Sequence, residues 1–357
     1  MASPPKTSFT IGTRKSALAL AQTHLVLDAI KKAYPDYEFK IFSQETAGDL
    51  NTVMPLKDFT TKNLWTEELE QHMIAGHVDF IAHSLKGGHL HSVIPHFYPA
   101  SYSLPNSPDV PTLLPSTCTL GPTITREDSR DVLVVKQGLP YKSLAELPAG
   151  SVVGTSSVRR TAQLARKYPH LKVENVRGNL GTRLSKLDAE DSPFTCIILA
   201  AAGLLRLDLG DRITQYLDWE NSGWLYAVGQ GAIGIEIRAG DNVLLDILKK
   251  VEDRETTFAV LAERSLLRTL EGGCSAPLGV ESEWVQTSAG RRLRMRSIVV
   301  SVDGKDCAEV ELHGDVDSAD QAEGFGVTVA NALVADGAGA ILEVIQQEKQ
   351  SKENVTV

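Results

Sequence analysis

Long hydrophobic runs are missing from this 357-residue sequence. No apolar stretch approaches the roughly 20 residues that a membrane-spanning helix needs. The first residues, MASPPKTSFTIGTRKS, lack the basic start and following apolar segment of a secretory signal. We therefore expect a cytosolic protein that has no membrane partner.

Cysteine is also scarce. The four Cys residues lie far apart, and they form neither a CxxC pair nor the Cys and His spacing of a zinc site. Disulfides are not expected in a reducing compartment. The sequence therefore predicts no metal site. The four residues are Cys118, Cys196, Cys274 and Cys307.

Acidic residues outnumber basic ones, so the formal net charge is −9. A hydrophobic content of 42% and a charged content of 23% are typical of a soluble globular protein. A nucleic-acid-binding surface is basic, so we expect no nucleic-acid partner. An anionic ligand would have to be bound by a local concentration of Arg rather than by the overall charge.

One segment lacks charged residues altogether. Residues 87–108 contain no Asp, Glu, Lys or Arg, but they contain four Pro and three His. Neither a helical nor a strand period runs through them. The segment therefore interrupts the pattern of the surrounding chain.

Strand and helix patterns alternate along most of the sequence, which predicts the α/β class. The alternation runs through two lobes, and a smaller α+β part with three strands and C-terminal helices follows them. The first lobe has expected strands at 8–13, 37–46 and 78–85 and helices at 16–34 and 66–76. The second has expected strands at 130–135, 151–156, 172–177 and 194–203 and helices at 157–167 and 180–187. The last part has a helix at 256–270 and strands at 279–286, 292–302 and 307–314.

Basic and hydroxyl residues follow several of these strands. In open α/β sheets, ligands bind beyond the carboxyl ends of the strands, where helix N-termini expose backbone N–H groups. A single Arg at such a place is ordinarily a solvated surface charge. Because both lobes show the same arrangement, the sequence predicts a cleft between the lobes that holds a ligand with several carboxylates or phosphates.

Cys274 lies in the segment LEGGCSAPLG, where Gly272 and Gly273 end the preceding helix pattern. A lone Cys is often a small buried hydrophobe. A nucleophile or a covalent attachment point is the other interpretation. No His lies nearby in the sequence to activate the thiol, so both interpretations stay open.

Nine segments, in order and spread over nearly the whole chain, resemble the porphobilinogen deaminase (hydroxymethylbilane synthase) family. They are IGTRKSALALAQT, FIAHSLK, DVPTLLPSTCTLG, TREDSRDVLV, GTSSVRRTAQL, VRGNLGTRLSKL, AAGLLRL, GQGAIGIE and LEGGCSAPLG.

The resemblance implies two lobes like those of periplasmic binding proteins, with a cleft between them, and a small α+β domain. The implied domain bounds are 1–125 with 231–249, then 126–230, and then 250–357, which carries the cofactor Cys. It further implies a monomeric transferase of tetrapyrrole (heme) biosynthesis that condenses four porphobilinogen molecules to hydroxymethylbilane and releases ammonia.

In this family a dipyrromethane cofactor is joined to the protein by a thioether, here to Cys274. The catalytic Asp would be Asp109, which would hold pyrrole N–H groups and stabilise the positive, azafulvene-like species formed as ammonia leaves. The resemblance also implies that Lys86 is a catalytic residue. The residues matched to carboxylate binding are Arg14, Ser16, Ser84, Lys86, Thr155, Ser157, Arg159, Arg160, Arg177, Arg183 and Arg206.

The uncharged segment separates two of these residues. The family pattern continues from HSLK directly into an Asp, whereas here Gly87 follows Lys86 and the expected DVPTLLPS begins at Asp109. Residues 87–108 are therefore interpreted as an insertion, and our hypothesis is a translated intron. Two alternatives are a metal site formed by His89, His91 and His96, with or without His83, and a regulatory or partner-binding loop.

We expect the family fold to tolerate the insertion, because the cost of loop closure grows only logarithmically with loop length. Activity is expected to be strongly reduced or absent, since a displacement of about 1 Å in a reacting group can cost a hundredfold in rate. Two other functions stay open. One is a two-lobe protein that binds an anion without converting it, and the other is a transferase that uses Cys274 as an ordinary nucleophile.

Overall fold

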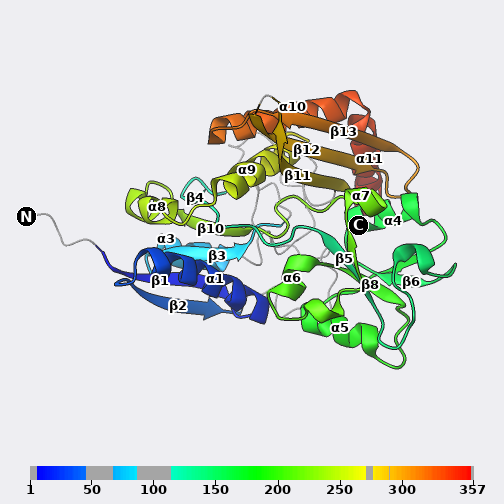
Figure 1. The fold of residues 1–357 in the computed structure, drawn as a ribbon, viewed down its shortest axis with the longest axis horizontal. Coiled ribbons are helices and arrows are strands. Elements are labelled where there is room, and N and C mark those ends of the chain that lie inside the picture. Colours follow the sequence, from blue (N-terminus) through cyan, green and yellow to red (C-terminus); the bar gives the residue numbers. More distant parts are fainter. Residues whose placement is uncertain (1–5, 46–66, 87–113, 271–275, 289, 355–357) are drawn as a thin grey trace, which may run out of the picture. The chain divides into compact units, whose positions relative to one another are not determined.

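The computed structural model describes residues 6–45, 67–86, 114–270, 276–288 and 290–354. The chain forms two compact units (Figure 1). Unit 1 comprises residues 1–127 and 231–257, and unit 2 comprises residues 128–230 and 258–357. Each unit contains a five-stranded sheet, and unit 2 also contains a three-stranded sheet. The expected α/β class with a smaller α+β part is confirmed.

The sheet of unit 1 has the strand order β2-β1-β3-β10-β4. Strand β1 runs parallel to β2 and β3, whereas β10 is antiparallel to β3 and β4. Helices α1 and α8 pack on one face of this sheet, and α3 packs on the other. The elements are β1 (Ser8–Arg14), α1 (Ala17–Ala33), β2 (Glu38–Gln44), α3 (Glu67–Ile74), β3 (Phe80–Ser84), β4 (Cys118–Leu120), β10 (Ile233–Arg238) and α8 (Asn242–Lys249).

Helix α1 shows how the sequence sets its bounds. The Ser16 hydroxyl accepts a hydrogen bond from the backbone N–H of Ala19, which caps the first turn. The helix stops at Ala33, two residues before Pro35, because a residue that precedes proline disfavours the helical conformation. Val26 and Ile30 are completely buried against the sheet. The cap therefore fixes the helix beside the carboxyl end of β1.

The five-stranded sheet of unit 2 has the order β7-β6-β8-β5-β9. Strand β6 is parallel to β7 and β8, whereas β5 is antiparallel to β8 and β9. Side chains from β5 and β8 enter separate apolar clusters on the two faces. The elements are β5 (Asp131–Val135), η2 (Leu144–Glu146), β6 (Val152–Gly154), α4 (Val158–Lys167), β7 (Lys172–Glu174), α5 (Leu180–Asp188), β8 (Cys196–Ala200), α6 (Ala201–Leu205), η3 (Gly210–Arg212), β9 (Gln215–Leu217) and α7 (Trp219–Ser222).

Several of the expected strands are shorter in the structure, and those expected at 151–156, 172–177 and 194–203 are half as long. The strand expected at 194–203 ends at Ala200, and the next residues form helix α6. Ala201, Ala202 and Leu204 are buried. An apolar run of this length fits a buried strand and a buried helix equally well, so the sequence pattern alone could not place the boundary. The strand expected at 172–177 ends at Glu174.

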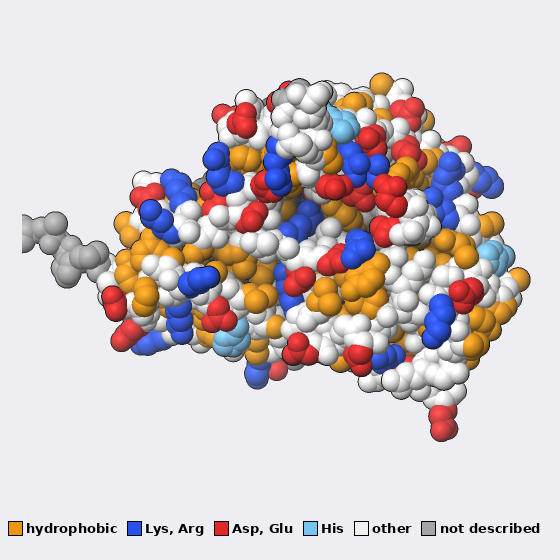
Figure 2. Space-filling model, in the orientation of Figure 1, with side chains coloured by type: hydrophobic (Ala, Val, Ile, Leu, Met, Phe, Trp, Pro, Cys, Tyr) orange, Lys and Arg blue, Asp and Glu red, His pale blue; other side chains and the backbone are white. Residues whose placement is uncertain are grey.

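The smaller sheet of unit 2 is an antiparallel meander in the order β11-β12-β13. Side chains from one face of it pack with α9, α10 and α11 in an apolar core. Figure 2 shows acidic and basic side chains interspersed over the region of these strands, and Arg294 and Arg296 both pair with Glu281 there. The elements are α9 (Arg254–Thr269), β11 (Leu278–Thr287), β12 (Gly290–Val300), β13 (Cys307–Gly314), α10 (Ala319–Ala335) and α11 (Ala338–Asn354).

Candidate functional site

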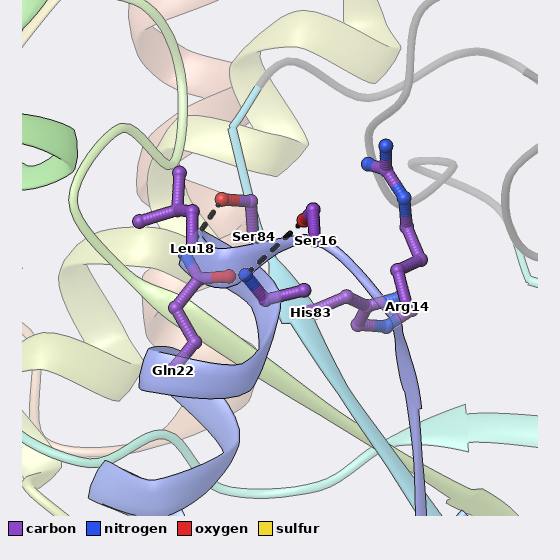
Figure 3. Close-up of a pocket in the computed structure, with 7 residues that line it drawn as sticks. Arg14, Ser16, Leu18, Gln22, His83 and Ser84 are labelled. Atoms are coloured by element: carbon purple, nitrogen blue, oxygen red, sulfur yellow. Dashed lines mark hydrogen bonds between the residues drawn. The ribbon is translucent and has the colours of Figure 1, made fainter. Parts of the chain in front are cut away.

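The carboxyl edge of the unit 1 sheet holds a small pocket. Because β1 and β3 are parallel, Arg14 at the end of β1 and Ser84 at the end of β3 reach the same edge. The pocket has a volume of about 50 Å³ (Figure 3). Gln22 of α1 donates from Nε2 to the Ser84 hydroxyl at 2.8 Å. The residues that line the pocket are Arg14, Ser16, Leu18, Ala19, Gln22, His83 and Ser84.

Lys86 lies two residues beyond β3 and is half-buried. The backbone between the strand and Lys86 is held, because Leu85 donates its N–H to the Ala232 carbonyl. Next to Ser84, the imidazole Nε2 of buried His83 lies 3.5 Å from a carboxylate oxygen of Glu236, which is fully buried. The strand end that presents Ser84 and Lys86 is thus fixed by a backbone hydrogen bond and a buried polar pair.

The corresponding edge of the unit 2 sheet contains a buried carboxylate. Strand β5 begins at this edge because it runs antiparallel to β8, so Asp131 lies beside Ala200, where β8 ends. Asp131 accepts hydrogen bonds from Arg159, Arg160, Trp224 and Gln230 at 2.7–3.2 Å. All of these side chains are at most 4% exposed. One carboxylate therefore neutralises part of the charge of two buried guanidinium groups.

The two arginines differ in how many of their guanidinium nitrogens have an acceptor among the described residues. Arg160 uses Nε and Nη2 on Asp131 and Nη1 on the Ile198 carbonyl. Arg159 uses only Nη1, on Asp131 and on the Leu225 carbonyl. Among the residues that the structure describes, none accepts a hydrogen bond from Nε or Nη2 of Arg159. Burial lowers the pKa of Arg159, and the charge of Asp131 opposes that shift. Arg159 therefore retains two buried donors for a further anion.

Four of the remaining predicted residues of unit 2 lie around the starts of α4 and α5, and the fifth, Arg206, lies at the end of α6. Thr155 is buried, and its hydroxyl accepts from the Ser157 N–H at 3.2 Å. Ser157 caps α4, accepting from the Arg160 N–H at 3.5 Å. Arg183 donates from Nε to the Gly178 carbonyl at 2.8 Å. Arg177 and Arg206 are half-buried; Arg177 lies three residues beyond β7, and Arg206 caps the C-terminus of α6 rather than following a strand.

Two of the predicted residues, Asp109 and Cys274, lie outside the described residues. The structure also brings in polar side chains that the sequence analysis did not place at the site: Gln22, Asp131, Trp224 and Gln230. A signal for Asp131 was present, because a charged residue that opens the wholly apolar run VLVV has to find a counter-charge.

Each unit thus presents guanidinium and hydroxyl groups at the carboxyl edge of its own sheet, an arrangement typical of α/β proteins that bind carboxylate or phosphate groups. The model of the family "Porphobilinogen deaminase, dipyromethane cofactor binding domain" matches residues 9–92 and 103–246. The model "Porphobilinogen deaminase, C-terminal domain" matches residues 257–335.

Curated relatives match over nearly the whole length. A porphobilinogen deaminase of Yarrowia lipolytica is 48% identical over 95% of this chain and 93% of its own length. Those of Saccharomyces cerevisiae and Schizosaccharomyces pombe are 44% and 42% identical, and they cover 95% and 99% of this chain and 97% and 99% of their own lengths. The chain belongs to the porphobilinogen deaminase family, a family of transferases.

Among solved structures, the periplasmic VFT2 domain of Bordetella pertussis BvgS is 15% identical with a TM-score of 0.37. The match covers 69% of this chain and 86% of that domain.

Proposed function

We propose that this chain is a hydroxymethylbilane synthase of heme biosynthesis, which condenses four porphobilinogen molecules head to tail and releases ammonia at each condensation. We further propose that it acts in the cytosol as a monomer, without a nucleic-acid or membrane partner. The observation that carries the proposal is the match of both family models over most of the chain.

The residues at the unit 2 edge fit the dipyrromethane cofactor that the family implies. Its pyrroles bear acetate and propionate groups, and Arg159 has two buried donors that no described residue satisfies. A buried donor without an acceptor is costly, so a carboxylate at this place would remove that cost. When bound through Cys274, the cofactor supplies the pyrrole to which substrate units are added.

The other residues have supporting roles in this proposal. Thr155, Ser157, Arg160, Arg177, Arg183 and Arg206 hold carboxylates at the unit 2 edge, and Arg14, Ser16 and Ser84 hold carboxylates at the unit 1 edge. Lys86 holds a substrate carboxylate beside the reaction. Asp109 holds pyrrole N–H groups and stabilises the positive charge that develops as ammonia leaves.

The segment 87–108 is proposed to be an insertion that impairs the reaction. The family model leaves residues 93–102 of this segment unmatched, which supports the interpretation. The inserted loop costs on the order of a few kcal/mol, whereas the catalytic Asp109 loses its peptide bond to Lys86. Activity of the full chain is therefore proposed to be low. Sequencing genomic DNA and mature transcripts tests the intron hypothesis, which fails if every mature message retains the segment.

Intact-protein mass spectrometry tests the cofactor assignment. The expected result is a mass excess of two pyrrole units, which is absent in Cys274→Ser and retained in the matched control Cys307→Ser. Cys307 is half-buried on β13. An excess that survives Cys274→Ser would overturn the assignment of the attachment site.

A deletion of residues 87–108 tests the proposed function and the impairment separately. Porphobilinogen consumption is expected to rise about a hundredfold on deletion, and to stay low when the same positions carry 22 Gly and Ser residues. An unmodified mass and no turnover in the deleted chain would reject the enzyme in favour of a non-catalytic anion-binding protein. Full turnover in the undeleted chain would reject the impairment.

A further inference from the structure

A continuous buried network runs through unit 2 from helix α9 to the arginine pair. It passes through residues 224–230, which we call the relay segment. Helix α9 ends at Thr269, five residues before Cys274 in the sequence. Cys274 is the proposed attachment point, whereas Arg159 and Arg160 are proposed carboxylate ligands. The network therefore joins the helix that leads to the attachment point with the groups that hold the cofactor's carboxylates.

The first contact of the network is made by Glu263 of α9. Its side chain is fully buried, and its two oxygens accept hydrogen bonds from different partners. Oε2 accepts from the Gly229 N–H at 2.7 Å, and Oε1 accepts from the Ser282 hydroxyl at 2.5 Å. Gly229 has a φ of +68°, a conformation that favours glycine. The Glu263 carboxylate thus anchors a turn of the relay segment whose backbone conformation glycine adopts without steric cost.

The second contact leads from that turn to Asp131. Gln230 is fully buried, and its Nε2 donates both to the Ser129 carbonyl at 2.6 Å and to Oδ1 of Asp131 at 2.9 Å. Because Gln230 follows Gly229 directly, a movement of the turn displaces this amide. The position of the Asp131 carboxylate is therefore tied to the turn that Glu263 holds.

The relay segment touches the arginine pair at its other end as well. Trp224 donates from its indole N–H to Oδ2 of Asp131 at 2.8 Å. The Leu225 carbonyl accepts from Nη1 of Arg159 at 2.7 Å and from Gln163 at 2.9 Å. Both ends of the relay segment thus converge on the groups that orient Arg159 and Arg160.

We propose that Glu263 and Gln230 are positioning residues: they act through Asp131 to fix the guanidinium groups of Arg159 and Arg160 relative to the helix that precedes Cys274. Neither residue needs to touch the cofactor. The assignment of Arg159 and Arg160 as ligands rests on the proposed function. The hydrogen-bonded link from Glu263 through Gln230 to Asp131 does not.

The Trp224 indole proton tests the link, since it lies in the Asp131 network and its exchange with solvent is followed by NMR. Its resonance is assigned with Trp224→Phe. Glu263→Ala is expected to speed its exchange about tenfold or more, because Gly229 loses its buried acceptor. Glu263→Gln is expected to keep exchange slow, because the amide oxygen still accepts from Gly229 and its NH₂ can donate to Ser282.

Leu333→Ala is the matched control, since Leu333 is fully buried in the same unit but lies in the core below the smaller sheet. It lowers global stability without removing a hydrogen bond of the network. The proposal requires the Trp224 indole proton to exchange faster in Glu263→Ala than in Leu333→Ala when the two variants are compared at the same free energy of unfolding. Equal exchange in the two variants would overturn the proposal.

A second readout is the fraction of chains that carry the mass excess of two pyrrole units, measured in the full chain or, if none is seen there, in the chain without residues 87–108. Glu263→Ala and Gln230→Leu are expected to lower this fraction, and Glu263→Gln is expected to restore it. Unchanged occupancy in Glu263→Ala would contradict the functional half of the proposal. Absence of the excess in every chain would instead reject the proposed function, while the exchange result still decides the link.

Discussion

The two sheet edges present cations in different ways. At the unit 1 edge, Arg14 and Ser84 line a small pocket and are only half-buried. At the unit 2 edge, Arg159 and Arg160 are 4% and 3% exposed and share the carboxylate of Asp131. Burying two guanidinium groups without a counter-charge would be strongly unfavourable. The fold of unit 2 therefore depends on its proposed binding residues, whereas that of unit 1 depends on its own much less.

Among the substitutions considered, one at Asp131 is expected to change stability most. Asp131→Asn removes one acceptor oxygen and the negative charge that pairs with both arginines, so unit 2 is expected to lose about 3–5 kcal/mol of stability. Urea unfolding measures the change. Asp315→Asn is the control, because Asp315 makes an exposed ion pair with Arg292 in the same unit and should cost about 1 kcal/mol or less. A similar cost for both variants would contradict the comparison.

Cysteine reactivity compares the interiors of the two units. Burial raises the pKa of Cys118 in unit 1 to about 12, aided by the nearby charge of Glu236, and burial raises the pKa of Cys196 in unit 2 to about 12. Only the thiolate is nucleophilic. At pH 8 we expect both thiols to react with iodoacetamide about a thousandfold more slowly than a free thiol. Mass spectrometry of the native and urea-unfolded chain measures this, and rapid native labelling of either Cys would refute it.

Much of the fold could be predicted from local patterns, because the apolar run of β5 and the hydroxyl before α4 act over a few residues. The contacts that build the site act over longer distances. Gln22 bonds Ser84 across 62 positions, and Trp224 bonds Asp131 across 93. Asp131 meets the arginines because β5 runs antiparallel to β8, and no local sequence pattern shows the direction of a strand. The sequence thus predicted the cations but not the carboxylate that orients them.

Substitutions at Ser84 test how far the stability of unit 1 depends on its pocket residues. Ser84→Ala removes the acceptor of the Gln22 amide, which is 2% exposed, and should cost about 1–2 kcal/mol. Ser84→Thr keeps a hydroxyl and should cost less. Urea unfolding measures both, and the affinity for porphobilinogen shows whether the same hydroxyl also binds a ligand. A Ser84→Ala chain as unstable as Asp131→Asn would show that unit 1 depends on its site residues as strongly as unit 2.

Substitutions at the two capping serines are expected to change stability least, and they separate capping from anion binding in both units. Ser16 caps α1 and Ser157 caps α4, with hydrogen bonds of 3.3 and 3.5 Å. Ala at either position should cost about 0.5–1 kcal/mol, whereas Asp is as good a cap and its charge suits the helix N-terminus. Ser16→Asp and Ser157→Asp should therefore unfold like the parent chain.

The same two Asp variants should lose affinity for a carboxylate ligand, because the new negative charge stands where the hydroxyl is proposed to bind an anion. Isothermal titration with porphobilinogen, set beside urea unfolding, separates the two roles. If Ser157→Asp binds as the parent does while Ser16→Asp does not, the anion is held at the exposed edge of unit 1, and the buried arginines of unit 2 serve the fold rather than the ligand.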